Sequence, residues 1–84
     1  MDYTAMTTVI QTTLYHVEAL DPESGEWTRV QPAEFNEFYD GEDGFAHEIK
    51  AMAYSANVRD FTGGAKVRTV EEVTMQARRV VMEQ

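Results

Sequence analysis

The chain has 84 residues, 43% of them hydrophobic, and its 15 acidic against 7 basic side chains give a formal net charge of −8. This length allows one domain, predicted over residues 1–84, and an aromatic content of 11% argues against a disordered acidic tail. The absence of cysteine excludes disulfides, thiolate zinc sites and a cysteine nucleophile.

No apolar run approaches the roughly 20 residues that a membrane-spanning helix needs. The N-terminus carries Asp2 and no basic stretch ahead of an apolar core, so it does not match a secretory signal. We therefore expect a soluble, cytoplasmic protein without membrane contact, in the interior of the host cell if a phage encodes it. We expect residues 1–6 to be a loose lead-in.

The first predicted element is a long strand over Thr7–Ala19, which is rich in Thr, Val, Ile and Tyr. The segment Asp21–Gly25 supplies turn residues, and Glu26–Gln31 alternates again between two faces. This order predicts a β-hairpin.

A short aromatic turn is expected next. Pro32 suits the first position of a helical turn, and Phe35, Phe38 and Tyr39 at i, i+3 and i+4 would share one face. The segment Asp40–Gly44 would then break that turn.

An amphipathic helix is predicted after this break, with Asp43 as its N-cap and its end near Asn57. Its apolar stripe would consist of Phe45, Ile49, Met52, Ala53 and Ala56.

The last segment, residues 66–82, fits two interpretations. As a helix it would begin at Thr69, with Glu72 closing a capping box. As a strand its 17 residues would be long for one uninterrupted element, so it would need a bulge near Val70–Glu72. Its β-branched content favours the strand, and the helix stays open.

These elements predict an α+β fold of ββαβ type, a small antiparallel sheet with one main helix. The first strand carries large apolar residues on both faces, with Val9 and Val17 on one and Ile10 and Leu14 on the other. A single helix covers only one face, so the aromatic turn, a second copy of the chain or a partner must cover the other. We favour self-association, as a homodimer, or partner binding.

The acidic residues are clustered along the chain. Ten of the 15 acids lie between Glu18 and Glu48, where Arg29 is the one base. Such a block can dock on a basic protein surface and mimic nucleic-acid phosphates, or it can be a solvated face that keeps the protein soluble. The predicted partner-binding residues are Glu34, Glu37, Phe38, Tyr39, Asp40, Glu42 and Asp43.

No motif indicates catalysis, a cofactor or a metal. The loop at Asp40 fails the calcium pattern, because its sixth position is Phe45 rather than Gly. His16 and His47 have no metal-ligand spacing, and neither Ser24 nor Ser55 has a base at a recognisable distance in sequence. We expect a protein that is not an enzyme.

Three features of the sequence together match those of a known class of small proteins. They are the hairpin of Tyr15–Val17 with Trp27–Val30, the acidic run Glu34–Asp43 and the helix Phe45–Asn57. The chain resembles the small acidic proteins with which phages and mobile elements inhibit bacterial defence, anti-CRISPR proteins among them. The resemblance implies stoichiometric binding to a nuclease or a CRISPR surveillance complex at its nucleic-acid path. These proteins share no common motif, so no residue role is carried over.

The function expected first is therefore a non-enzymatic inhibitor whose acidic face docks on a basic surface of a nucleic-acid-binding complex, without binding nucleic acid directly. The alternative is a small structural or assembly subunit with a sheet-mediated homo- or hetero-oligomer interface. That alternative predicts that Ile10 and Leu14 matter for binding and that salt matters little.

Overall fold

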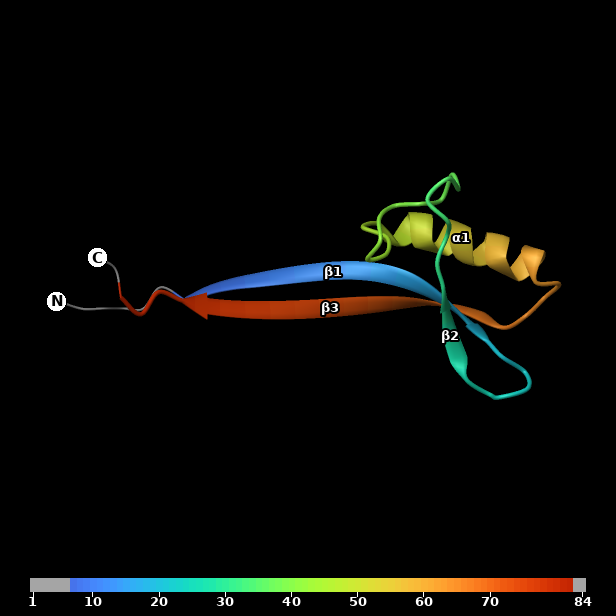
Figure 1. Ribbon diagram of the computed structural model, residues 1–84, viewed down its shortest axis with the longest axis horizontal. Helices are drawn as coiled ribbons and strands as arrows, with labels where there is room; N and C mark the ends of the chain where they lie inside the picture. Colours follow the sequence, from blue (N-terminus) through green and yellow to red (C-terminus); the bar gives the residue numbers. More distant parts are fainter. Residues whose placement is uncertain (1–6, 83–84) are drawn as a thin grey trace.

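The computed structural model describes residues 7–82, so the lead-in expected over residues 1–6 lies outside the described part. The elements follow the chain in the order β1 (Thr7–Leu20), β2 (Trp27–Val30), α1 (Glu48–Phe61) and β3 (Val67–Arg79). The three strands form one antiparallel sheet with the order β2-β1-β3, and α1 lies across it (Figure 1). The predicted α+β fold and its ββαβ order are confirmed.

The N-terminal hairpin is built as predicted. β1 and β2 pair from Val17 opposite Val30 to Leu20 opposite Trp27. In the turn, the Glu23 amide donates to Oδ1 of Asp21 over 2.9 Å. This bond lets the aspartate side chain hold the turn that brings the two strands together.

The pairing of β1 with β3 settles the interpretation of the last segment. It runs from Thr7 opposite Arg79 to Ala19 opposite Val67, so this segment is a strand and the helical alternative is wrong. The predicted bulge is also wrong, because His16 opposite Val70 and Leu14 opposite Glu72 keep one register. Val70 lies on the face opposite to that of Val67 and Val73, and no residue is inserted between them to shift the register.

The helix begins later than predicted. The backbones of Phe45 and Tyr15 exchange two N–H···O bonds of 2.8 Å, which hold this stretch extended. The chain bends after Phe45, and α1 starts at Glu48 behind His47, which has an extended backbone and gives no side-chain cap. The predicted cap at Asp43 is therefore wrong, since a contact with a distant strand sets the start. The predicted end near Asn57 is also wrong, because the helix continues to Phe61.

The buried face of the helix also differs from the predicted stripe. Its buried residues are Ala51, Tyr54 and Val58. Ile49 is 82% exposed, and Met52 also faces outward. Of the predicted stripe only Phe45 is buried, and it precedes the helix. The core is small because β1 contributes one fully buried residue, Val17.

The expected aromatic turn is two successive tight turns rather than a helical one. The Asn36 amide donates to the Ala33 carbonyl over 2.9 Å, and the Tyr39 amide donates to the Asn36 carbonyl over 3.0 Å. Phe38 packs on Tyr54 with ring centroids 5.6 Å apart, whereas Phe35 is 94% exposed. The shared aromatic face is therefore wrong, and these aromatics do not cover the second face of the sheet.

The molecule is elongated. Its radius of gyration is 18.6 Å and its extents are 65 × 29 × 19 Å, whereas a compact chain of this length would have a radius of about 12 Å. The cause is the outer half of the β1–β3 ribbon, which projects away from the helix (Figure 1). We call residues 7–13 paired with residues 73–79 the arm, and residues 14–72 the head. Seven residues of strand give the arm a length of about 20 Å.

Candidate interaction surfaces

The arm has two faces, which follow from the strand register. Directly opposed residues of an antiparallel pair point to the same face. Val17, the buried residue under α1, shares its face with every second residue along β1. We call this the helix-side face of the arm, and its members with described side chains are Val9, Gln11, Thr13, Val73, Met75, Ala77 and Arg79.

The helix-side face changes abruptly from buried to exposed. Val17 is 0% exposed in the head, but Val9 is 57% exposed and Met75 is 68% exposed on the arm. The same apolar face therefore continues past the end of its cover. Exposed apolar side chains that continue a buried face are one of the features by which interaction surfaces are recognised.

The opposite face of the sheet is made polar in the head by a charged network around Glu18. Nε of Arg68 donates to Oε1 of Glu18 over 2.7 Å, and Nε2 of His16 lies 3.1 Å from Oε2 of Glu18. The hydrogen bond from Arg68, followed by that from His16, lowers the pKa of Glu18 below its ordinary value. Arg68 also lies over the ring of Trp27, 4.1 Å from its centroid. This face is satisfied by its own side chains, so the head needs no second cover there.

Several of the predicted acidic residues gather around Tyr39 in the loop between β2 and α1. Partial burial raises the pKa of Tyr39, and the carboxylates of Glu34, Glu42 and Asp43 raise it further. Glu34, Glu42 and Asp43 are exposed, whereas Tyr39 is half-buried. The three carboxylates lie close enough to the phenol to act on it electrostatically, so this part of the loop is locally negative.

Two of the predicted contact residues also make contacts within the head. The carboxylate of Asp40 accepts the Ala46 amide over 2.8 Å and Nζ of Lys50 over 3.2 Å. The bond from Ala46, followed by that from Lys50, holds the pKa of Asp40 below its ordinary value. Phe38 is half-buried against Tyr54. Asp40 and Phe38 therefore help to hold the loop on the head.

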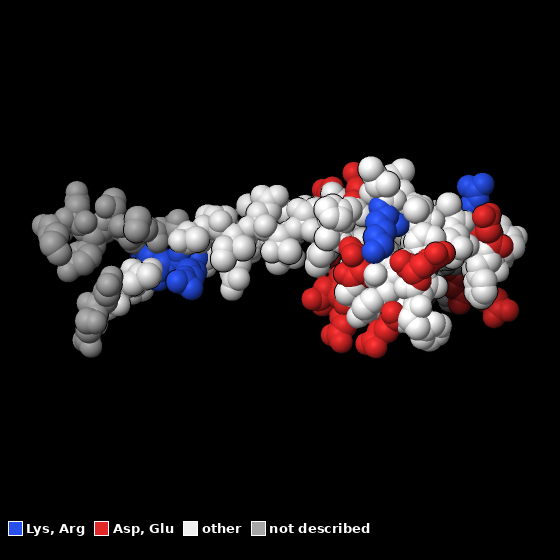
Figure 2. All heavy atoms as spheres, turned by 90° about the horizontal axis from the view of Figure 1, so that it is seen from above, with Lys and Arg blue, Asp and Glu red and all other residues white. Residues whose placement is uncertain are grey.

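The rest of the acidic block is divided over the head. Glu37 is exposed on the second tight turn, Glu18 lies in the sheet network, and Glu23 and Glu26 are in the turn between β1 and β2. Figure 2 shows acidic side chains on several parts of the head and basic side chains at the far end of the arm. The head is thus negative over a wide area, and the arm ends in Arg78 and Arg79.

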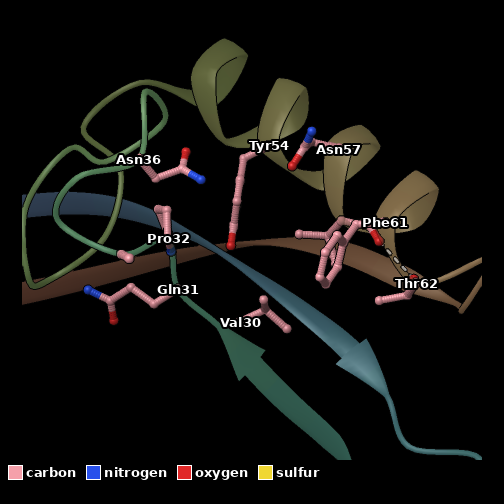
Figure 3. Close-up of a pocket in the computed structure, with 10 residues that line it drawn as sticks. Val30, Gln31, Pro32, Asn36, Tyr54, Asn57, Phe61 and Thr62 are labelled. Carbon is pink, nitrogen blue, oxygen red and sulfur yellow. Dashed lines mark hydrogen bonds between the residues drawn. The ribbon is translucent and has the colours of Figure 1, made fainter.

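A small pocket lies between α1 and the segment that leaves β2 (Figure 3). Its volume is about 250 Å³, and Val30, Pro32, Tyr54 and Phe61 contribute to its wall. Tyr54 is the one titratable side chain among its described lining residues, and burial raises the pKa of this phenol. The polar groups of the lining are therefore neutral hydroxyls and amides, and its described residues include no acid–base pair of the kind that marks a catalytic site.

Sequence reasoning did not identify the helix-side face of the arm as an interface. The residues that it singled out for a sheet-mediated interface were Ile10 and Leu14. Ile10 does lie on the arm and is exposed, but on the face opposite Val9, and Leu14 is half-buried where the head begins. Val73 and Met75 are two residues apart on β3, as Val9 and Gln11 are on β1, so along each strand the side chains of one face alternate with those of the other. That alternation is visible in the sequence, but it identifies one shared face only when the β1–β3 register is known.

Within residues 7–82, no group of three or more histidine or carboxylate side chains is arranged to hold a metal ion. No helix in the same part of the chain is long and apolar enough to cross a membrane. Comparison with protein-family models, with curated proteins and with solved structures found no match.

Proposed function

We propose that this chain is a non-enzymatic assembly subunit that joins other polypeptides through its arm. The observation that carries the proposal is the helix-side face, which is closed over Val17 and open at Val9 and Met75. Burying these side chains in an interface would stabilise a complex by about 25 cal/mol for each Å² of apolar surface removed from water. The arm presents them on a regular, hydrogen-bonded ribbon rather than on a loop.

The backbone of the arm supports the same proposal. Unpaired strand edges offer N–H and C=O groups to an added strand, which is a common mode of protein recognition. Soluble proteins normally shorten, bend or cover such edges. Here β3 is an edge strand of 13 residues, and no strand of residues 7–82 lies on its outer side.

A second candidate function rests on a different surface, the acidic cluster around Tyr39. We propose as this alternative that Glu34, Glu42 and Asp43 dock on a basic surface of a nucleic-acid-binding complex, such as a nuclease or a CRISPR surveillance complex. Their convergence on one half-buried ring favours it. Encounter between such surfaces is steered by charge, so binding would weaken as ionic strength rises.

Site-specific photocrosslinking in the source cell separates the two candidates. A photoreactive phenylalanine analogue replaces Val9 on the arm in one variant and Phe35 on the loop in the other; both positions are exposed. An assembly subunit gives a defined crosslinked polypeptide from position 9. Crosslinks from position 35 alone would refute the arm proposal and support the acidic one.

The acidic alternative has its own charge test. Glu42→Lys with Asp43→Lys should abolish the salt-sensitive capture of a nucleic-acid-binding protein. Glu23→Lys with Glu26→Lys makes the same change of net charge in the β1–β2 turn and should leave capture intact. Equal loss in both variants would show that only overall charge matters and would refute a specific site.

A further inference from the structure

Within residues 7–82, no strand or loop pairs with the outer edge of β3. The Tyr15 amide and carbonyl bond to Phe45, on the side of β1 that faces away from β3. Main-chain groups alternate sides along a strand, so the odd-numbered residues of β1 point away from β3 and the even-numbered ones point toward it. The register pairs even with even, as in Ile10 opposite Gln76. The odd-numbered residues of β3 therefore direct their N–H and C=O groups to the outer edge.

The side chains along this edge are symmetrical about Met75. Two glutamates, Glu71 and Glu72, lie four and three residues before it, and two arginines, Arg78 and Arg79, lie three and four residues after it. The residues between them match as well. Val73 and Ala77 are apolar and flank Met75 on the helix-side face, while Thr74 and Gln76 are polar and lie on the other face.

We infer that β3 pairs antiparallel with β3 of a second copy of this chain, with a two-fold axis at Met75. This pairing rests on the proposed function of the arm and names its partner. In this register Glu71 lies opposite Arg79 of the second copy, and Glu72 lies opposite Arg78 of the second copy. The symmetry repeats both pairs, so each end of the shared ribbon carries one ion pair on each face. The contact is isologous and closes as a dimer.

The charges select this register over its neighbours. Sliding one strand by two residues keeps the main-chain bonds but places Glu71 opposite Ala77 or Val81 of the second copy, which removes the ion pairs. Neither Arg78 nor Arg79 forms an ion pair within residues 7–82. All residues from 71 to 79 are exposed, so the edge is accessible to a second chain.

The outer edge of β1 is a weaker candidate for the same role. Phe45 occupies it at Tyr15, which leaves only residues 7–13 open. That stretch has no ionisable side chain and so carries no charge signal for a register. Pairing through β3 instead gives one six-stranded sheet, four strands wide across the arms, in which the two heads lie at opposite ends because the paired strands are antiparallel.

Two variants of identical composition test the register. Glu72→Arg with Arg78→Glu keeps every cross-strand pair opposite in charge, whereas Glu72→Arg with Arg79→Glu makes every pair like-charged. We expect the wild type and the first variant to sediment as dimers and the dimer dissociation constant of the second to rise at least about tenfold. Both variants keep the net charge of −8 and both lose the Glu72 carboxylate, so their difference reports only the pairing.

Single-cysteine crosslinking gives a second measurement that does not depend on charge. The chain has no native cysteine. Met75→Cys should form a disulfide dimer readily, because opposed Cα atoms in such a pair lie about 5.5 Å apart. Val73→Cys alone should not crosslink, but mixed with Ala77→Cys it should, since these positions oppose each other across the axis.

Three results would overturn the pairing: a wild type that stays monomeric at high concentration, equal association of the two permuted variants, or equal crosslinking of Met75→Cys and Val73→Cys. A monomeric protein whose position 9 still crosslinks to another polypeptide in cells would overturn the self-pairing and leave the assembly function standing. A monomeric protein without any arm crosslink would overturn both.

Discussion

Gly44 is the position where a single added methyl group should do the most damage. Its φ is +122°, and a Cβ there would lie 2.6 Å from the carbonyl oxygen of Tyr15 and 3.2 Å from Nη2 of Arg29. That oxygen cannot move aside freely, because it accepts the Phe45 amide over 2.8 Å. Gly44→Ala should therefore push the loop off β1 and break the bridge that precedes the helix.

The size of the effect follows from two contributions. Holding a residue with a side chain at this φ costs about 2 kcal/mol, and losing the two Tyr15–Phe45 bonds costs about 1 kcal/mol each. Gly44→Ala should thus lower the free energy of unfolding by about 4 kcal/mol. Gly41→Ala is the matched control, because its φ is +123° but its nearest atom would be 3.9 Å from the new Cβ. It should lose only the strain part, about 2 kcal/mol.

Equilibrium unfolding in urea measures both variants, with fluorescence of the single tryptophan, Trp27, as the probe. A chain of this length has a total stability of about 4 to 13 kcal/mol. At the low end Gly44→Ala loses its cooperative transition while Gly41→Ala keeps one. Free energies of unfolding that agree within about 0.5 kcal/mol would refute the steric argument.

Three other changes have defined outcomes. Val17→Ala removes the fully buried residue of β1 and should lower the free energy of unfolding by about 2 to 3 kcal/mol in urea; a loss under about 0.5 kcal/mol would contradict its place in the core. The pKa of Glu18 is lower in the folded protein than its ordinary value of 4.5, so its pairing with Arg68 stabilises the fold at pH values above 4.5. This stabilisation is lost as the pH falls through the folded-state pKa. Glu18→Gln should lower the Tm at neutral pH and flatten its decline in acid, and an unchanged acid limb would contradict this. Replacing all four charged residues of β3 between Glu71 and Arg79 with alanine should convert the protein to fibrils that bind thioflavin.

The fold was largely predictable because its sequence signals are either confined to a short turn or repeated along a long strand. Turn residues at Asp21–Gly25 between two β-branched stretches define the hairpin. The two long strands, which lie near opposite ends of the sequence, have similar lengths and pair with each other. The helix was predicted with the wrong start and the wrong face. Its start depends on a bridge between Phe45 and Tyr15, which local periodicity does not contain.

The helix has two apolar stripes in sequence, and periodicity alone cannot choose between them. Ile49 and Met52 fit a helical face as well as Tyr54 and Val58 do. The stripe that contains Tyr54 is the buried one, because the Tyr54 ring packs against Phe38 and Phe45, with a centroid distance of 5.6 Å in each pair. Those partners come from the loop ahead of the helix, so the choice is tertiary.

The candidate sites were predictable only in part for the same reason. Charge density identified Glu34, Glu42 and Asp43, which do converge on one ring. It could not show that Asp40 bonds the Ala46 amide, because that role depends on the path of the loop. The symmetry of β3 is present in the sequence, but it has a meaning only for a strand whose outer edge is open.

The fibril prediction for the alanine variant follows from the two ways in which identical edges can stack. Parallel, in-register stacking places Glu71 against Glu71 and Arg79 against Arg79, so the native charges repel in the arrangement typical of amyloid. Antiparallel pairing about Met75 places opposite charges together. Without these four side chains, the stretch from Thr69 to Met82 has high β-propensity, no charged side chain and neither proline nor glycine, so no charge within it opposes parallel stacking. An alanine variant that remains a soluble dimer at high concentration would show that main-chain pairing alone sets the direction, and the charge argument for β3 would then fail.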